Sequence, residues 1–141
     1  MSVRENIASN LLTVISNISS PAIKKATRQP FLLDELSEQQ YPAVMVQTSE
    51  ENRDDSELGS GARTRHGTID FVVLGFVKGA ESNIDTLRNA LITAIETAIE
   101  TDITRDSNAL DSEVIQVETD EGSLFPVGGI KMTIRCMYEY Q

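Results

Sequence analysis

The sequence contains only one cysteine and one histidine, and it contains no tryptophan. A single cysteine excludes an intramolecular disulfide and suits a reducing compartment. A single histidine excludes metal sites that are built from two or more histidines. Aromatic residues make up only 5% of the chain, which argues against a stacking platform for single-stranded nucleic acid.

Long apolar runs are also absent from the sequence. No run reaches the roughly 18 residues that a membrane-spanning helix needs, so no contact with a membrane is predicted. The first five residues lack the charged-then-apolar layout of a signal peptide, and the cytoplasm is therefore the expected location. The chain has 141 residues, of which 40% are hydrophobic and 24% charged. This predicts one soluble domain over residues 1–141, large enough to bury a core.

The chain is strongly acidic, with 22 acidic and 12 basic residues and a net charge of −10. Nucleic-acid affinity depends on basic side chains that neutralise phosphates, so specific DNA or RNA binding is not expected. An acidic wall does allow DNA to pass without sticking, as a conduit requires. The same charge also serves solubility, and composition leaves both interpretations open.

Two segments have the periodicity of amphipathic helices. The first begins at Ser2, which has capping-box spacing with Glu5, and ends near Ile18. The second runs from about residue 83 to 101, after a similar signature at Ser82. Its apolar arc of roughly 160° is wider than the roughly 100° that docking on one core needs. The additional width predicts contact with the first helix or with a neighbouring subunit.

The remaining pattern predicts strands at 41–47, 68–78, 113–120 and 130–140, and an extended segment at 22–31. The strand at 68–78 is apolar on both faces, which places it centrally, and Gly75 within it suggests a bend or bulge. The last two strands are expected to form an antiparallel hairpin. The order α-β-β-β-α-β-β predicts an α+β fold: one largely antiparallel or mixed sheet with two main helices on one face.

The C-terminal strand is unusually long. From Ile130 to Tyr140, side chains alternate between an apolar face and a more polar one, with Met137 as the exception. Residues 127–141 would extend over about 50 Å, whereas a globule of this size has a diameter of roughly 37 Å. We therefore expect the strand to curl or to overhang. An unpaired, overhanging edge is expected to pair with an identical subunit.

A charged stretch from about residue 48 to 67 is expected to be a mobile loop, acidic in its first half and basic in its second. It is either a solvated surface loop or a segment that becomes ordered against a partner. The interface candidates are charges of this loop and of the polar face of the last strand: Asp54, Asp55, Glu57, Arg63, Arg65, Arg135 and Glu139.

The sequence predicts no catalytic residue, no bound metal and no cofactor. Cys136 lies on the apolar face of the last strand, which is typical of a small buried hydrophobe, and His66 lies in the polar loop. Asp102, Asp106 and Glu113 have the spacing of calcium-loop ligands, but the glycine that such a loop needs is missing. A small α+β enzyme, or a ligand- or metal-binding module that uses these residues or His66, remains the alternative.

The layout of the whole chain resembles the tail terminator (tail completion) proteins of tailed bacteriophages. The segments that carry the resemblance are the N-terminal helix (residues 4–12), the Tyr-Pro-Ala-Val strand (41–44), the long strand that ends in Gly-Phe-Val-Lys-Gly (75–79), the helix that begins Asn-Ile-Asp-Thr-Leu-Arg (83–88), and the terminal strand (132–140). The resemblance rests on the order, length and character of these elements, since no short motif defines the family.

This resemblance implies a structural virion protein of the tail or neck. Its subunits would form a hexameric ring that caps the tail tube, stops tube polymerisation and joins the tube to the head-completion connector. The partners implied are further copies of the chain, the tail tube protein and the connector protein, with DNA passing through unbound. No functional residue follows from the resemblance, because members of the family differ widely in sequence.

Overall fold

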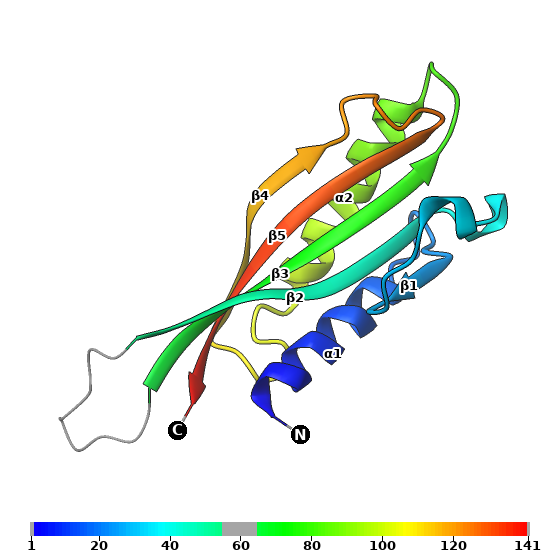
Figure 1. Ribbon diagram of the computed structural model, residues 1–141. Coiled ribbons are helices and arrows are strands. Elements are labelled where there is room, and N and C mark those ends of the chain that lie inside the picture. The colour runs from blue at the N-terminus through cyan, green and yellow to red at the C-terminus, as the bar shows by residue number, and fades with distance from the viewer. Residues whose placement is uncertain (1, 55–64, 141) are drawn as a thin grey trace.

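A computed structural model describes residues 2–54 and 65–140, except for the side chains of Asp54, Arg65 and Tyr140. The elements follow the order that the sequence predicts (Figure 1). They are α1 (Val3–Ser16), β1 (Lys25–Thr27), the 3₁₀ helices η1 (Leu33–Glu35) and η2 (Glu38–Gln40), β2 (Ala43–Asp54), β3 (Arg65–Lys78), α2 (Ile84–Thr101), β4 (Asp111–Thr119) and β5 (Val127–Tyr140). The protein is therefore an α+β protein, as expected.

The five strands form one mixed sheet in the order β1-β2-β3-β5-β4. The short β1 is parallel to β2, and every other neighbouring pair is antiparallel. Both helices lie on the same face of the sheet, with α2 packed on β3, β4 and β5 and α1 beside β1 and β2 (Figure 1). The predicted hairpin of the last two strands and the central position of β3 are confirmed.

The core lies between the helices and this face of the sheet. On β5, Ile130, Met132, Ile134, Cys136 and Tyr138 are all buried, which confirms the alternation seen in the sequence. They meet the apolar stripes of the two helices, contributed by Ile7, Leu11 and Ile15 of α1 and by Leu91, Ile95 and Ile99 of α2. Burial of this shared apolar surface is the main force that holds the helices on the sheet.

The expectation of an unpaired edge on the last strand is wrong. β5 lies inside the sheet, paired with β3 from Val127 to Tyr140 and with β4 along most of its length. β3 is 14 residues long, as β5 is, so it accompanies β5 from end to end (Figure 1). Tyr138, near the end of β5, is only 2% exposed. The length of β5 is therefore accommodated within one subunit. One open edge of the sheet is β4, and the other consists of the three-residue β1 and the part of β2 beyond Met45, which β1 does not pair.

Half of the expected loop at 48–67, residues 48–54 and 65–67, is strand instead. β2 continues to Asp54 and β3 begins at Arg65, with the ladder extending to the pair Asp54↔His66. A β-bulge between Thr48 and Glu50 shifts the register of β2 within this stretch. Polar residues occupy these strand ends because they bond to one another, as the Glu51 cluster below shows. Residues 55–64 of the expected loop lie outside the described residues.

The two helices begin differently. Ser2 caps α1 as predicted, because its Oγ accepts a hydrogen bond from the Glu5 amide at 3.1 Å. The prediction of a Ser82 cap is wrong: α2 begins one residue later, and the Oδ1 of Asn83 accepts from the Ala80 amide at 2.8 Å. The wide apolar arc of α2 does contact α1, which confirms the prediction that it contacts the first helix.

Gly75 produces no bulge, contrary to the prediction. At Gly75, β3 keeps its register with both of its neighbours, β2 and β5. A Cβ at this position would lie 2.8 Å from Leu91 Cδ2 and 2.9 Å from Ile130 Cγ1. The glycine is needed because it lets α2 approach the sheet closely.

Candidate functional site

The residues with calcium-loop spacing do not form a metal site. Both oxygens of the Asp102 carboxylate accept hydrogen bonds from the turn itself: the amides of Thr104 and Asp106, each at 2.9 Å, and the Thr104 hydroxyl. These hydrogen bonds, that of the Thr104 hydroxyl first, lower the pKa of Asp102 to about 2. Glu113 lies elsewhere, on β4 opposite Arg135. Within residues 2–54 and 65–140, no three His, Cys, Asp or Glu side chains are grouped to hold a metal.

Cys136 and His66 have ordinary surroundings. Cys136 is fully buried, with its sulfur 3.4 Å from the Ser112 hydroxyl, and burial raises the pKa of the thiol. This is the buried hydrophobe that the sequence predicted, and it is unlike a reactive thiolate. His66 lies at the start of β3, 3.5 Å from Glu139 across the strand pair.

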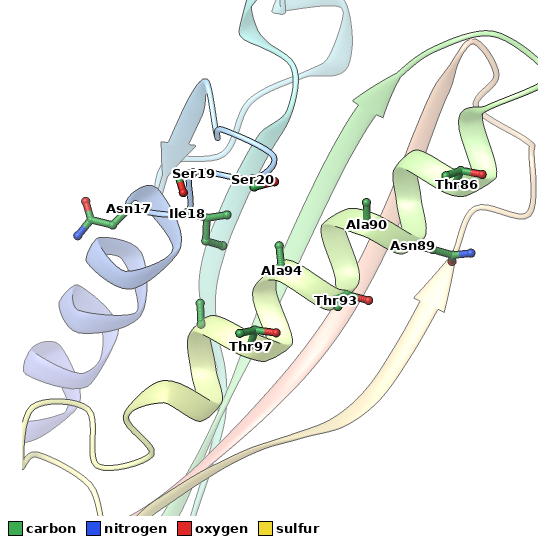
Figure 2. A pocket seen from close by; sticks show the side chains of 11 residues that line it. Asn17, Ile18, Ser19, Ser20, Thr86, Asn89, Ala90, Thr93, Ala94 and Thr97 are labelled. Atoms are coloured by element: carbon green, nitrogen blue, oxygen red, sulfur yellow. The ribbon is translucent and has the colours of Figure 1, made fainter.

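A groove of about 730 Å³ separates the end of α1 from the outer face of α2 (Figure 2). Its lining carries no charged side chain and consists mainly of alanine, threonine, serine and asparagine. Figure 2 shows Ala90, Thr93, Ala94 and Thr97 in successive turns of α2 along one side of the groove. Such a lining supplies neither an acid–base group nor a metal ligand.

Of the predicted interface charges, Arg135 and Glu139 can be placed. Arg135 makes a two-pronged ion pair with Asp70 on the face of the sheet opposite the helices, with Nε–Oδ1 and Nη2–Oδ2 distances of 2.8 and 3.0 Å. Glu139 lies near His66 on the same face. β2 ends at Asp54 and β3 begins at Arg65, and the side chains of these two residues are not described. Asp55, Glu57 and Arg63 lie outside the described residues.

A charged cluster around Glu51 was not predicted from the residue pattern. This carboxylate accepts from Arg4 Nε at 2.5 Å, from Arg53 Nε at 2.9 Å and from the Tyr138 hydroxyl. The hydrogen bond from Arg4, followed by those from Tyr138 and Arg53, lowers the pKa of Glu51 to about 2. The cluster connects α1 with β2 and β5, close to the C-terminal ends of these two strands. Its members lie 47 and 87 residues apart in sequence, so only the fold brings them together.

We predict that Glu51→Gln reduces stability at neutral pH but has little effect in acid. The pKa of Glu51 falls on folding, so its contribution is fully present above about pH 4.5 and is lost as the pH falls toward 2. The wild-type chain should exceed the variant by about 1–2 kcal/mol at pH 7, and this difference should shrink steadily below pH 4.5. Urea denaturation at a series of pH values measures it. The exposed neighbour Glu50, changed to glutamine, is the control and should cost less than about 0.5 kcal/mol at any pH. A difference independent of pH would contradict the assignment.

Exposed apolar side chains gather along one flank of the sheet. Of the eight large hydrophobic residues that are exposed in the described part of the chain, seven belong to β4, to the connections before and after it, or to the adjoining part of β5. We call this surface the β4 flank; its apolar members are Ile103, Leu110, Ile115, Val117, Leu124, Phe125 and Met137. The eighth residue, Leu32, is 64% exposed and follows β1 at the opposite edge. Gathered apolar exposure of this kind is typical of contact surfaces.

The two edges of the sheet also carry opposite charge. Residues 106–130, which include β4, contain six acidic residues and no basic one. Residues 6–33, which include β1, contain three basic residues, Lys24, Lys25 and Arg28, and no acidic one. Arg28 makes an ion pair with Glu5 of α1. We call residues 24–32 the β1 flank. Because β1 and β4 are the first and last strands of the sheet, these charges lie on opposite sides of the subunit.

Comparisons with known proteins add little to this geometry. No family model matches the chain, and no curated protein matches it. A solved structure described as the virion of a native gene transfer agent particle contains a similar chain, with a TM-score of 0.47 and 11% identity over 99% of this chain and 92% of that one. A likeness at this level carries no argument about function. No helix among the described residues is long and apolar enough to cross a membrane.

Two further features of the structure have a signal in the sequence, although they were not predicted. Arg88 is buried on α2 and pairs with Asp120, and its spacing from Ile84 and Leu91 already places it on the buried face of the helix. The two charge-segregated segments, 6–33 and 106–130, are visible in the sequence as well. Their opposition across the sheet was not predictable, because it depends on the strand order.

Proposed function

We propose that this chain is a structural protein of a phage-like virion: a tail terminator whose subunits form a hexameric ring. The ring caps the tail tube, stops its polymerisation and joins it to the head-completion connector. The observation that carries this proposal is the β4 flank, an exposed apolar surface on a rigid sheet edge. The element order predicted from the residue pattern, on which the resemblance to tail terminators rests, is found in the structure and supports the proposal.

The charge of the subunit suits such a ring. A net charge of −10 repels phosphates, so DNA would move through the ring without specific binding. The ends of β2 and β3 at Asp54 and Arg65, together with Arg135 and Glu139 on the open sheet face, are the proposed contacts with the tube or the connector. Asp55, Glu57 and Arg63 belong to the same proposal. The virion tail or neck is the corresponding location, after assembly in the host cytoplasm.

Native mass spectrometry and negative-stain microscopy of the purified protein test the ring. The expected result is a closed particle with the mass of six copies of the 15.5 kDa chain. Capping is tested by adding the protein to polymerising tail tube protein from the same virion. Tubes should become shorter, with a ring at one end. Tubes of unchanged length with bare ends would contradict the proposed function.

A further inference from the structure

We infer that the β4 flank of one copy binds the β1 flank of a second copy, edge to edge and head to tail. The inference rests on the proposed function, because it names the contact by which the ring closes. The two flanks are different surfaces, so the contact is heterologous, and repeating it generates a ring when the rotation between copies closes.

The first argument for this contact is charge. The exposed acidic side chains of β4 are Asp111, Glu113 and Glu118, and β4 itself carries no basic residue. Glu113 and Glu118 face Arg135 and Lys131 on the inner side, across the pair with β5. Lys24 and Lys25 occupy the far edge, where Lys24 is exposed and Lys25 lies 5.6 Å from the Phe31 ring. A β4 flank placed on another β4 flank would bring like charges together, which costs several kcal/mol. The β1 flank of a second copy is the complementary surface.

The second argument is the direction of the strands. β4 and β3 are both antiparallel to β5 and therefore run the same way. β1 is parallel to β2, which is antiparallel to β3, so β1 runs opposite to β4. When a second copy continues the sheet in the same orientation, its β1 meets β4 in antiparallel fashion. Antiparallel pairing is the more stable arrangement per residue.

The third argument is apolar surface that the subunit leaves uncovered. Ile115 and Val117 of β4 are each 40% exposed, and Leu32 on the β1 flank is 64% exposed. An exposed strand with this much apolar surface pairs non-specifically unless something covers it. An edge contact covers apolar residues of both flanks and pairs the three-residue β1 with part of the free backbone edge of β4.

Paired charge reversals test the contact. In the acidic-edge variant, Glu113→Lys is combined with Glu118→Lys; in the basic-edge variant, Lys24→Glu is combined with Lys25→Glu. Each variant alone should assemble with an apparent Kd at least about tenfold weaker than wild type, because like charges now face each other. Mixed in equal amounts, the two variants should assemble again, because every junction between unlike copies has opposite charges. Native mass spectrometry should find equal numbers of the two variants in each particle.

Control variants separate this effect from net charge and from misfolding. Glu81→Lys combined with Glu100→Lys makes the same change in net charge on the α2 side and should leave assembly intact. Circular dichroism and thermal melting check that each variant folds, since Glu113 and Glu118 face Arg135 and Lys131 across the strand pair. Ile115→Lys leaves those cross-strand pairs untouched and should also weaken assembly.

The outcomes distinguish the contact from the proposed function. Full-size rings in either reversal variant would overturn the edge contact while leaving the terminator ring in place. Wild-type assembly into open chains that the reversals abolish would support the edge contact and overturn the ring. A wild-type chain that stays monomeric up to about 1 mM, the weak limit of measurable association, would overturn the edge contact between copies. Failure of the mixture to reassemble, with both variants folded, would also overturn it.

Discussion

Asp120→Ala is expected to lower the free energy of unfolding by about 3–5 kcal/mol, which is the cost of breaking a buried ion pair by removing one of its members. The Asp120 and Arg88 side chains are 6% and 8% exposed, and their Oδ1–Nη1 distance is 2.6 Å. The Asp120 carboxylate also accepts from the amides of Leu124 and Gly129 at 2.9 and 3.0 Å. Burial alone would raise the pKa of Asp120, but these amides and Arg88 together lower it.

The chain supplies a matched control for this prediction. Asp85 contacts the same guanidinium, with Oδ1 2.9 Å from Arg88 Nη2, but its side chain is 73% exposed. An exposed pair contributes little, so Asp85→Ala should cost less than about 1 kcal/mol. Urea denaturation of both variants, followed by circular dichroism, measures the difference. Equal losses of unfolding free energy for Asp85→Ala and Asp120→Ala would contradict the prediction, because burial of the Asp120–Arg88 pair would then not determine its contribution to stability.

Asp120 also bears on assembly. Its hydrogen bonds hold the connection between β4 and β5, which presents Leu124 and Phe125 on the β4 flank. Loss of the carboxylate should loosen this part of the proposed contact surface. Asp120→Ala is therefore unsuitable as a test of the edge contact, whereas the surface reversals avoid this problem.

Phe71→Ala is expected to cost about 3–5 kcal/mol, the usual penalty for removing a buried aromatic ring. Phe71 is fully buried beneath the helices, opposite Ile134 on β5. Its neighbour Val72 points to the other face of the sheet and is partly exposed, so Val72→Ala should cost about 1 kcal/mol or less.

The Phe71 and Val72 pair tests which face of β3 carries the core. The sequence could not decide this, because residues 71–77 are apolar on both faces. Thermal and urea denaturation of the two alanine variants should give clearly different losses. Similar losses would mean that both faces of β3 are equally buried, for example because a stable partner covers the open face in solution.

The errors of sequence interpretation share a physical cause. The predicted strands end where the residues become polar, near residue 48 on β2 and residue 68 on β3. The structure continues both strands because their polar side chains bond to each other and to β5, as Glu51 does with Tyr138. Likewise, Gly75 suggested a bulge, whereas it marks the point where Leu91 of α2 approaches the sheet. Such long-range contacts leave no local pattern.

The residue pattern alone is enough to establish the element types and their order, the buried face of β5 and the apolar stripes of both helices. Periodicities of 2 and 3.6 residues are local properties, so they can be read without knowing the partner of each element. That β5 lies inside the sheet, with β4 at one edge and β1 and the rest of β2 at the other, follows only from the folded structure. Strand order depends on which distant segments pair, and that choice places the basic and acidic segments on opposite sides of the subunit.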